Sequence, residues 1–600
     1  MSVQATFVAT LVEEWLRCGV RHAVIAPGSR STPLAMALAE ADGLVVHVHP
    51  DERSAAFMAL GIGIATGVPA VVLTTSGTAA VETHPAVVEA GLARVPLLVC
   101  TADRPSGLRE VGAPQVIDQT HLFGRAVRWF FEPGVAEGFP ISTWRSLAAR
   151  SVAETLGSPR GPVHLNLAFA EPLLGEPDVL PEGRDGGRPW HQVIRVPRHP
   201  DPSALEEIAE VLRAERGVIV AGGPGTEPEA VSALARAMGW PVLADPRSGC
   251  RVPGPRTVAA FDALLRDEGF AASHRPDVVL RIGELPASKV LAGWLARSGA
   301  RQVLIDHDGA WLDPDRLVEW VVAGDPAAWC RALAEHLSEP LAEPMGVGRR
   351  GTWTSSWHDA ERAAQRAIEA TLERVDASIS FASTSFPGQG SDGPNSDTNS
   401  DTNSEPAVAR RVVETLAPGS TLVVSSSMPV RDVEWYSAPR SDIRVVANRG
   451  ANGIDGVVST AVGVALGGSG PTTLLIGDLA FLHDANGLLG LARRNPDLTI
   501  VVVDNRGGGI FSFLPQASVL DRQRFEQLFA TPQEVDLVGI VTAHGLPALT
   551  AHDPEGFDVA LRVAREASGT HVIVVRTDRL RNVAAHDEIH VAVAQAIARP

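Results

Sequence analysis

A carboxylate and an amide follow two neighbouring predicted strands in the C-terminal third of the chain. Asp478 comes directly after an apolar strand at 473–476, and Asn505 follows the next strand, at 498–503. Because ligands of open parallel sheets bind outside the carboxyl ends of the strands, both side chains should face one crevice. Their oxygens, with the backbone carbonyl of Gly507, suit Mg²⁺, which takes further ligands from water and phosphates. The spacing therefore predicts a magnesium–diphosphate site, with an ordinary βαβ unit as the alternative.

The elements that must position these residues follow from the pattern of apolar segments. A helical pattern over 480–494 joins the two strands into one βαβ unit, and the same alternation starts at residue 7 and resumes at residue 407. Strands that are almost entirely apolar indicate parallel sheets covered by helices on both faces. We therefore expect an α/β fold with three doubly wound, mainly parallel-sheet domains. The expected divisions are an N-terminal domain (1–175), a linker (176–202), a central domain (203–345), a linker with an insertion (346–405) and a C-terminal domain (406–600).

The insertion is predicted from composition. Residues 376–405 contain the tandem sequence SDTNSDTNS among Ser, Gly, Pro and Asn, with too few apolar side chains to form a core. This composition predicts a disordered surface segment. Deletion of residues 386–404 should then leave folding and activity almost unchanged.

Composition also limits the classes of partner. The chain has 600 residues, enough for several cores, and its net charge of -18 argues against nucleic acid and anionic membrane surfaces as partners. The four cysteines (Cys18, Cys100, Cys250 and Cys330) form no CxxC pair, as is typical of a reducing compartment. The N-terminal segment lacks the basic start of a signal peptide, and no apolar run is long enough to span a membrane. We expect a cytoplasmic protein without a membrane span.

Further charged residues lie near other predicted strand ends. Glu52 follows a strand at 44–49 and falls in the first turn of the next helix, which on its own indicates only a carboxylate that favours a helix N-terminus. Five cations lie at or just beyond strand ends: Arg30, Arg104, Lys289, Arg431 and Arg449. Any one of them is most often a solvated surface charge, but together they predict a cleft for anions. The segment IAPGSRSTPL, a glycine turn that runs into a helix, adds backbone N–H groups to such a site.

These motifs resemble those of thiamine-diphosphate (ThDP)-dependent enzymes. The segment from Gly477 to Asn505 is similar to the GDG…NN motif of that family, with Leu479 for the second glycine and Asp504 for the first asparagine. The resemblance implies a pyrimidine-binding N-terminal domain, a central domain and a diphosphate-binding C-terminal domain. It implies Mg²⁺, or Mn²⁺, bound by Asp478, Asn505 and Gly507, and a catalytic Glu52 that bonds the pyrimidine ring. The cofactor-binding residues that it implies are Glu52, Ser427, Ile454, Gly477, Asp478, Leu479, Asn505, Gly507, Gly508 and Ile510.

Within the family, GDLAFLHD, GGGIFSFLP and the cations resemble the synthases of menaquinone biosynthesis that join 2-oxoglutarate to isochorismate. Such a transferase decarboxylates 2-oxoglutarate and adds the remaining four-carbon unit to isochorismate by 1,4-addition. Each substrate carries two carboxylates, which arginine can hold in a fixed orientation. Pro114 departs from the family's GANQ run beside Gln115. The substrate-binding residues that the resemblance implies are Ser29, Arg30, Arg104, Gln115, Lys289, Arg431, Arg449, Phe511 and Leu514.

The resemblance further implies a homodimer or a dimer of dimers with shared sites, in which Glu52 comes from one subunit and the metal from its partner. Ile454 would support the bent cofactor, and Ile510, Phe511 and Leu514 would form an apolar wall; core packing explains these residues equally well. Two alternatives stay open. One is a pyruvate-using relative of the acetohydroxyacid synthase type, and the other is a catalytically silent protein of the same fold that acts as a regulatory subunit.

Overall fold

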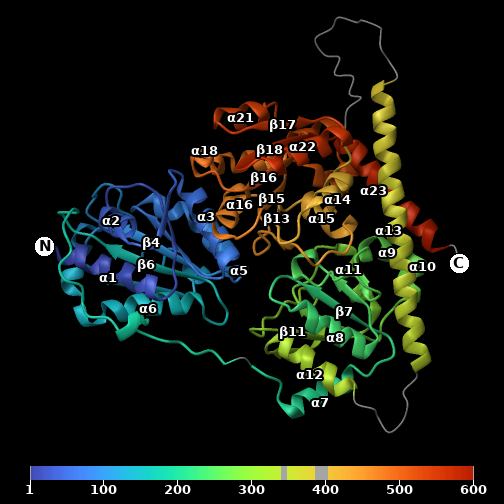
Figure 1. The fold of residues 1–600 in the computed structure, drawn as a ribbon, viewed down its shortest axis with the longest axis horizontal. Helices are drawn as coiled ribbons and strands as arrows, with labels where there is room; N and C mark the ends of the chain where they lie inside the picture. The colour runs from blue at the N-terminus through green and yellow to red at the C-terminus, as the bar shows by residue number, and fades with distance from the viewer. Residues whose placement is uncertain (1, 197, 339–346, 385–402, 599–600) are drawn as a thin grey trace, which may run out of the picture.

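The computed structural model describes residues 2–196, 198–338, 347–384 and 403–598. It contains three parallel sheets of six strands each, all flanked by helices, which confirms the predicted α/β class. Figure 1 shows the N-terminal sheet at the left, the central sheet at the lower right and the C-terminal sheet above it. Among the described helices, none combines the length and the apolar character needed to cross a membrane.

The N-terminal sheet has the strand order β2-β1-β3-β4-β6-β5. Its strands are β1 (His22–Ile25), β2 (Val45–Val48), β3 (Ala70–Thr74), β4 (Leu97–Asp103), β5 (Trp129–Gly134) and β6 (Pro162–Ala168). Its helices are α1 (Val3–Arg17), α2 (Thr32–Glu40), α3 (Glu52–Thr66), α4 (Thr78–Glu82), α5 (His84–Leu92) and α6 (Trp144–Thr155).

The C-terminal sheet repeats this topology, with the order β14-β13-β15-β16-β18-β17. Its strands are β13 (Thr421–Val424), β14 (Arg444–Val446), β15 (Thr472–Gly477), β16 (Leu498–Asp504), β17 (Ala548–Ala551) and β18 (Thr570–Arg576). Its helices are α14 (Glu405–Thr415), α15 (Met428–Tyr436), α16 (Val457–Gly467), α17 (Asp478–His483), α18 (Leu491–Arg494), α19 (Gln516–Val519), α20 (Arg522–Phe525), α21 (Leu537–Ala543), α22 (Pro554–Glu566) and α23 (Arg579–Ile597).

The central sheet is connected differently, in the order β12-β11-β10-β7-β8-β9. Its strands are β7 (Gly217–Gly222), β8 (Val242–Ala244), β9 (Thr257–Val258), β10 (Val278–Gly283), β11 (Arg301–Asp306) and β12 (Val318–Ala323). Its helices are α7 (Pro202–Val211), α8 (Pro228–Met238), α9 (Phe261–Arg266), α10 (Glu268–Ser273), α11 (Lys289–Ser298) and α12 (Pro326–Ser338).

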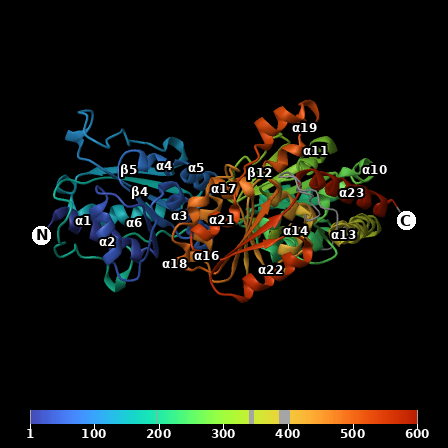
Figure 2. The same ribbon diagram turned by 90° about the horizontal axis from the view of Figure 1, so that it is seen from above.

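The N- and C-terminal domains share one continuous apolar core, which passes through helices α3 and α16. Figures 1 and 2 both show these helices where the two domains meet. Glycines permit the close approach: a Cβ added at Gly61 would lie 2.1 Å from the Thr460 carbonyl oxygen, and one at Gly463 would lie 2.0 Å from the Met58 carbonyl oxygen. Side chains at these positions would force the helices apart. The contact places the start of α3, which carries Glu52, near the loop that precedes α16.

Two predicted elements differ in the structure. The helix expected over 480–494 is divided into α17, a 3₁₀ turn (Ala485–Leu488) and α18. Gly490 adopts a left-handed conformation with φ 74°, which an uninterrupted helix would not contain.

The other difference is α13 (Val347–Thr384), which replaces most of the linker and insertion predicted over 346–405. Its buried apolar residues recur at helical spacing and pack against α9, α11 and α23: Trp353, Trp357, Ala360, Ala364, Ile368 and Leu372. The tandem sequence lies outside the described residues except for Asn403 and Ser404. Both are buried, and the Asn403 N–H donates to the Arg576 carbonyl at 3.0 Å. The deletion predicted to be neutral would therefore remove packed residues.

Candidate active site

The expected cation site lies where β15 and β16 end side by side. The two strands pair in parallel up to Gly477 and Val503. Asp478 is buried at the start of α17, where its Oδ1 accepts from the Leu479 N–H at 2.7 Å and its Oδ2 accepts from the Gly507 N–H at 2.7 Å. The structure thus brings together Asp478 and the glycine loop, as the strand-end argument predicts.

Asn505 supplies the amide on the neighbouring strand end. Its Nδ2 donates to Glu405 Oε1 at 2.9 Å, while its buried Oδ1 has no hydrogen-bond partner in the described part of the chain. Burying an amide oxygen without a hydrogen-bond partner costs free energy unless a ligand interacts with that oxygen. The arrangement therefore fits a bound cation.

The glycines after Asn505 allow the loop to fold tightly against its surroundings. Gly507 has φ 139°, and a Cβ there would lie 2.3 Å from the Ala530 carbonyl oxygen. The Gly508 N–H donates to the same carbonyl at 2.8 Å. The next residues, Gly509–Phe513, form a 3₁₀ turn that holds Ile510 and Phe511 half-buried. Leu514, which follows, is also half-buried, so these apolar side chains are partly accessible, as an apolar wall requires.

Several acidic groups converge on this site. Burial, and then the charge of Asp504, raise the pKa of Asp478 to about 7. Burial, and then Asp432, raise the pKa of Glu405 to about 8. Asp504 is an ion-pair partner of Arg576, so the acid that replaces an asparagine in the motif already has a cation. Arg579 offsets only part of the rise in the pKa of Asp478, and a bound divalent cation would neutralise Asp478 and Glu405 further.

No group of three or more His, Cys, Asp or Glu side chains suited to a metal occurs in the ranges that the structure describes. One carboxylate, one amide oxygen and one backbone carbonyl would form a mixed oxygen donor set instead. That set suits a hard cation that keeps water or phosphate ligands, as Mg²⁺ does.

Glu52 begins α3 beside the same end of the C-terminal sheet. Its neighbours fix the turn: Arg53 Nη2 donates to the His483 carbonyl at 2.9 Å, and Ser54 Oγ donates to Asp484 Oδ1 at 3.2 Å. The half-buried Glu52 carboxylate has no hydrogen bond within the described residues, so it is available to a ligand. Glu52 therefore lies at the start of a helix that is tied to the segment directly after the expected cation site.

The loop before α16 carries two further predicted residues, Arg449 and Ile454. The Glu89 carboxylate from α5 accepts from the Gly450 N–H at 2.8 Å and from the Ala451 N–H at 2.6 Å, which ties this loop to the N-terminal domain. Ile454 is 36% exposed, which is consistent with a role in contacting a ligand.

Ser427 follows β13 with φ 79° and ψ -134°, a conformation that is strained for a residue with a side chain. Such strain is concentrated at functional sites. Its carbonyl accepts a hydrogen bond from Arg431, one turn further along α15. The two predicted residues are therefore in direct contact.

Arg30 and Arg104 lie together at the carboxyl edge of the N-terminal sheet. Arg104 donates to Ser76 Oγ and, at 2.9 Å, to the Gln115 carbonyl, while Arg30 pairs with Glu171 at 3.2 Å. Burial and the charge of Arg30 lower the pKa of Arg104. Ser29 and Gln115 are exposed beside them, so the structure groups four predicted substrate residues.

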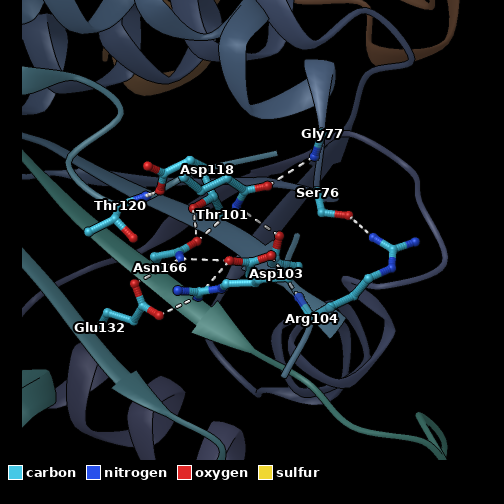
Figure 3. A network of polar contacts seen from close by, with 12 residues as sticks. Ser76, Gly77, Thr101, Asp103, Arg104, Asp118, Thr120, Glu132 and Asn166 are labelled. Atoms are coloured by element: carbon cyan, nitrogen blue, oxygen red, sulfur yellow. Dashed lines mark hydrogen bonds and ion pairs between the residues drawn. The ribbon is translucent and has the colours of Figure 1, made fainter. Parts of the chain in front are cut away.

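A polar network behind Arg104, shown in Figure 3, was not predicted from sequence. Asp103 accepts from the Arg104 N–H at 2.7 Å and from Asn166 Nδ2 at 2.9 Å. Gln119 Nε2 donates to Asn166 Oδ1 at 2.8 Å, and Gln119 Oε1 accepts from the Gly77 N–H at 2.9 Å. The network fixes the backbone from which Arg104 extends.

Arg431 and Arg449 form a second cationic group. Burial lowers the pKa of both, and the charges of Arg247 and Arg431 lower that of Arg449 further. Lys289 is exposed at the first residue of α11, and its loop is held to α15 because the Ala287 N–H donates to Glu434 Oε2 at 2.7 Å. No hydrogen bond or ion pair in the described chain joins this group to the Arg30–Arg104 pair.

Comparison with known proteins defines the class first. Three family models match in order: the N-terminal TPP (thiamine pyrophosphate, that is, ThDP) binding domain of thiamine pyrophosphate enzymes at 4–122, their middle domain at 185–383, and their C-terminal TPP binding domain at 430–575. The outer two matches include Glu52 and the Asp478–Asn505 motif. The fold and these matches define a thiamine pyrophosphate enzyme.

Individual relatives narrow the class. Proteins named 2-succinyl-5-enolpyruvyl-6-hydroxy-3-cyclohexene-1-carboxylate synthase are similar along nearly the whole chain. The relative from Myxococcus xanthus is 41% identical, covering 99% of this chain and 98% of its own length. Those from Chloroflexus aurantiacus and Geobacillus kaustophilus are each 40% identical over 99% of this chain, and the matches cover 97% and 99% of their own lengths. The chain belongs to this synthase family of thiamine pyrophosphate enzymes.

Proposed function

We propose that this enzyme decarboxylates 2-oxoglutarate and adds the remaining four-carbon unit to isochorismate by 1,4-addition, with ThDP and Mg²⁺ or Mn²⁺ as cofactors, in menaquinone biosynthesis. The observation that carries the proposal is the buried, partner-free Oδ1 of Asn505 beside Asp478 and the Gly507 loop. The name of the relatives supports the product.

The residues that would hold the cofactor lie around this cation site. Asp478, Asn505 Oδ1 and the Gly507 carbonyl would bind the metal, and Ser427, Gly477, Leu479 and Gly508 would border the diphosphate. Ile454 and Ile510 would contact the rings. When bound, ThDP supplies the nucleophilic carbon on which the oxo acid loses CO₂. Glu52 would hold a proton at the pyrimidine ring nitrogen, the contribution of this chain to proton transfer.

The two cationic groups would bind the carboxylates of the substrates. Ser29, Arg30, Arg104 and Gln115 provide one set of donors, and Lys289, Arg431 and Arg449 provide the other. Because burial removes competing water, each guanidinium would orient a carboxylate strongly. Phe511 and Leu514, with Ile510, would exclude water from the reacting carbons.

The direct assay combines two readouts on the purified enzyme with ThDP, Mg²⁺ and 2-oxoglutarate. We expect slow CO₂ release without isochorismate, and rapid isochorismate consumption matched by CO₂ release when both substrates are present. Consumption of isochorismate without CO₂ release would contradict the proposed reaction.

We also propose a cytoplasmic homodimer or dimer of dimers with shared sites. Complementation between two inactive variants tests this proposal, because a shared site would take Glu52 from one chain and Asp478 from its partner. A mixture of Glu52→Gln and Asp478→Ala enzymes should regain activity if chains complement one another. Shared sites would be excluded if the mixture, refolded together, stays inactive.

A further inference from the structure

Glu405 is a buried carboxylate at the start of α14, on the side of Asn505 away from its partner-free oxygen. It is 3% exposed, and its Oε1 accepts from Asn505 Nδ2 at 2.9 Å and from Thr577 Oγ1 at 3.3 Å. The charged groups that act on it most strongly, Asp432 and Asp478, are acidic. Burial of a carboxylate among other acids is unfavourable unless hydrogen bonds and a nearby cation offset the cost.

The hydrogen bond from Asn505 determines which way its amide points. The NH₂ group of Asn505 donates to Glu405 Oε1, so the carbonyl oxygen of the same amide faces the other way. That oxygen is the buried Oδ1 without a partner in the described residues. If the amide turned over, its oxygen would face a carboxylate and its NH₂ group would face the cation site.

The surroundings hold this orientation in place. A Cβ at Gly509 would lie only 2.6 Å from Asn505 Nδ2, so the backbone closes in on the amide from that side. Thr577 holds Glu405 in turn: it lies directly after β18, and its N–H donates to the Asp504 carbonyl at 3.0 Å. Glu405 therefore connects Asn505 to the adjacent strand end.

We propose, on the basis of the cofactor site proposed above, that Glu405 is a positioning residue for the metal: its carboxylate fixes the Asn505 amide so that Oδ1 faces the cation. Neither the family motif nor the donor set of the metal includes it. Partners that orient metal ligands in this way typically contribute 10- to 100-fold to metal affinity.

The test measures Mn²⁺ binding by electron paramagnetic resonance at a fixed, saturating concentration of ThDP. We expect Glu405→Ala to raise the Mn²⁺ Kd by roughly 10- to 100-fold. Glu405→Gln should lose less Mn²⁺ affinity, because a glutamine oxygen can still accept from Asn505 Nδ2. The matched control is Glu361→Ala, which removes another buried carboxylate, one that accepts from the Ala260 N–H at 2.9 Å in the central domain. It should leave the Mn²⁺ Kd unchanged while lowering the apoenzyme melting temperature.

A double-mutant cycle separates positioning from general destabilisation. In an Asn505→Ala background, Glu405→Ala should change the Mn²⁺ Kd by less than about 2-fold, because no amide is left to orient. An unchanged Kd in the folded Glu405→Ala enzyme, or an equal loss in both backgrounds, would overturn the proposal. If Glu405→Ala does not fold, the same comparison with Glu405→Gln decides. Absence of metal-dependent ThDP binding in the wild type would instead refute the proposed function.

Discussion

The N- and C-terminal sheets have the same strand order but carry different chemistry at their carboxyl edges. At the end of β4, the buried Asp103 is paired with Arg109 at 2.8 Å and accepts a hydrogen bond from Asn166, and the next residue, Arg104, donates to Ser76. Beyond β15 and β16, Asp478 accepts hydrogen bonds only from backbone N–H groups within the described residues, and Asn505 keeps a partner-free oxygen.

The difference shows that topology provides the position of a site while residue types determine its use. At the N-terminal edge, Asp103 and Arg104 are both bonded to other side chains of the same domain. At the C-terminal edge, Asn505 Oδ1 has no hydrogen-bond partner within the described residues, so a bound ligand would complete it. Substitutions at the C-terminal edge should therefore affect cofactor binding, and those at the N-terminal edge should affect substrate binding.

The largest effect is expected at the C-terminal edge. Asp478→Ala should weaken metal-dependent ThDP binding by more than about 100-fold, because neutral ligands cannot offset the cost of dehydrating the ion. Calorimetric titration of the enzyme with ThDP in the presence of Mg²⁺ measures this affinity. Unchanged affinity would mean that Asp478 is only an acidic strand end.

Glu52 lies between the two edges, and it should affect turnover rather than binding. Glu52→Gln should retain ThDP but reduce kcat by roughly 100-fold or more, the scale of a lost proton-transfer partner. Steady-state CO₂ release and ThDP titration are the two measurements, with the exposed Glu82→Gln as a control. A near-normal kcat would mean that Glu52 has no role in proton transfer and serves only as a charge at the helix N-terminus.

Substitution at the N-terminal edge should weaken substrate binding without releasing the cofactor. Arg104→Ala should lower kcat/KM for 2-oxoglutarate and isochorismate by about 30-fold, near 2 kcal/mol, because neighbouring cations retain part of the charge. Arg431→Ala should behave similarly. If both variants matched the wild type in kcat/KM, the carboxylate assignment would be wrong.

The smallest effect is expected at Asp504, where this chain departs from the family motif. Its carboxylate already pairs with Arg576 and accepts from the Arg506 N–H at 3.2 Å. Asp504→Asn should therefore change the Mg²⁺ concentration that gives half-maximal activity by less than about 3-fold. A 100-fold change in the same Mg²⁺ titration would place Asp504 among the metal ligands.

Residues at strand ends were predictable from sequence because strand periodicity and the rule for parallel sheets both act locally. Asp478, Asn505 and Gly507 came together for that reason. Glu405 could not be found in this way, because its contact with Asn505 joins residues 100 positions apart in sequence.

Helix boundaries were predicted less well than strand ends. The regular spacing from Trp353 to Ile368 indicates a helix, but the low-complexity composition that follows led to the prediction of a linker. The grouping of Arg30 with Arg104, and of Arg431 with Arg449, depends on packing between separate elements. A single sequence contains no local signal for such contacts.

We propose that the two cationic groups select a dicarboxylic oxo acid as the substrate. The most direct measurement compares kcat/KM of the wild-type enzyme for 2-oxoglutarate and for pyruvate, which lacks the second carboxylate, with ThDP, Mg²⁺ and isochorismate present. A lost charge-assisted contact costs roughly 2–5 kcal/mol, so we predict a preference for 2-oxoglutarate of about 100-fold or more. Equal use of the two acids would contradict the claim and favour an enzyme of the acetohydroxyacid synthase type.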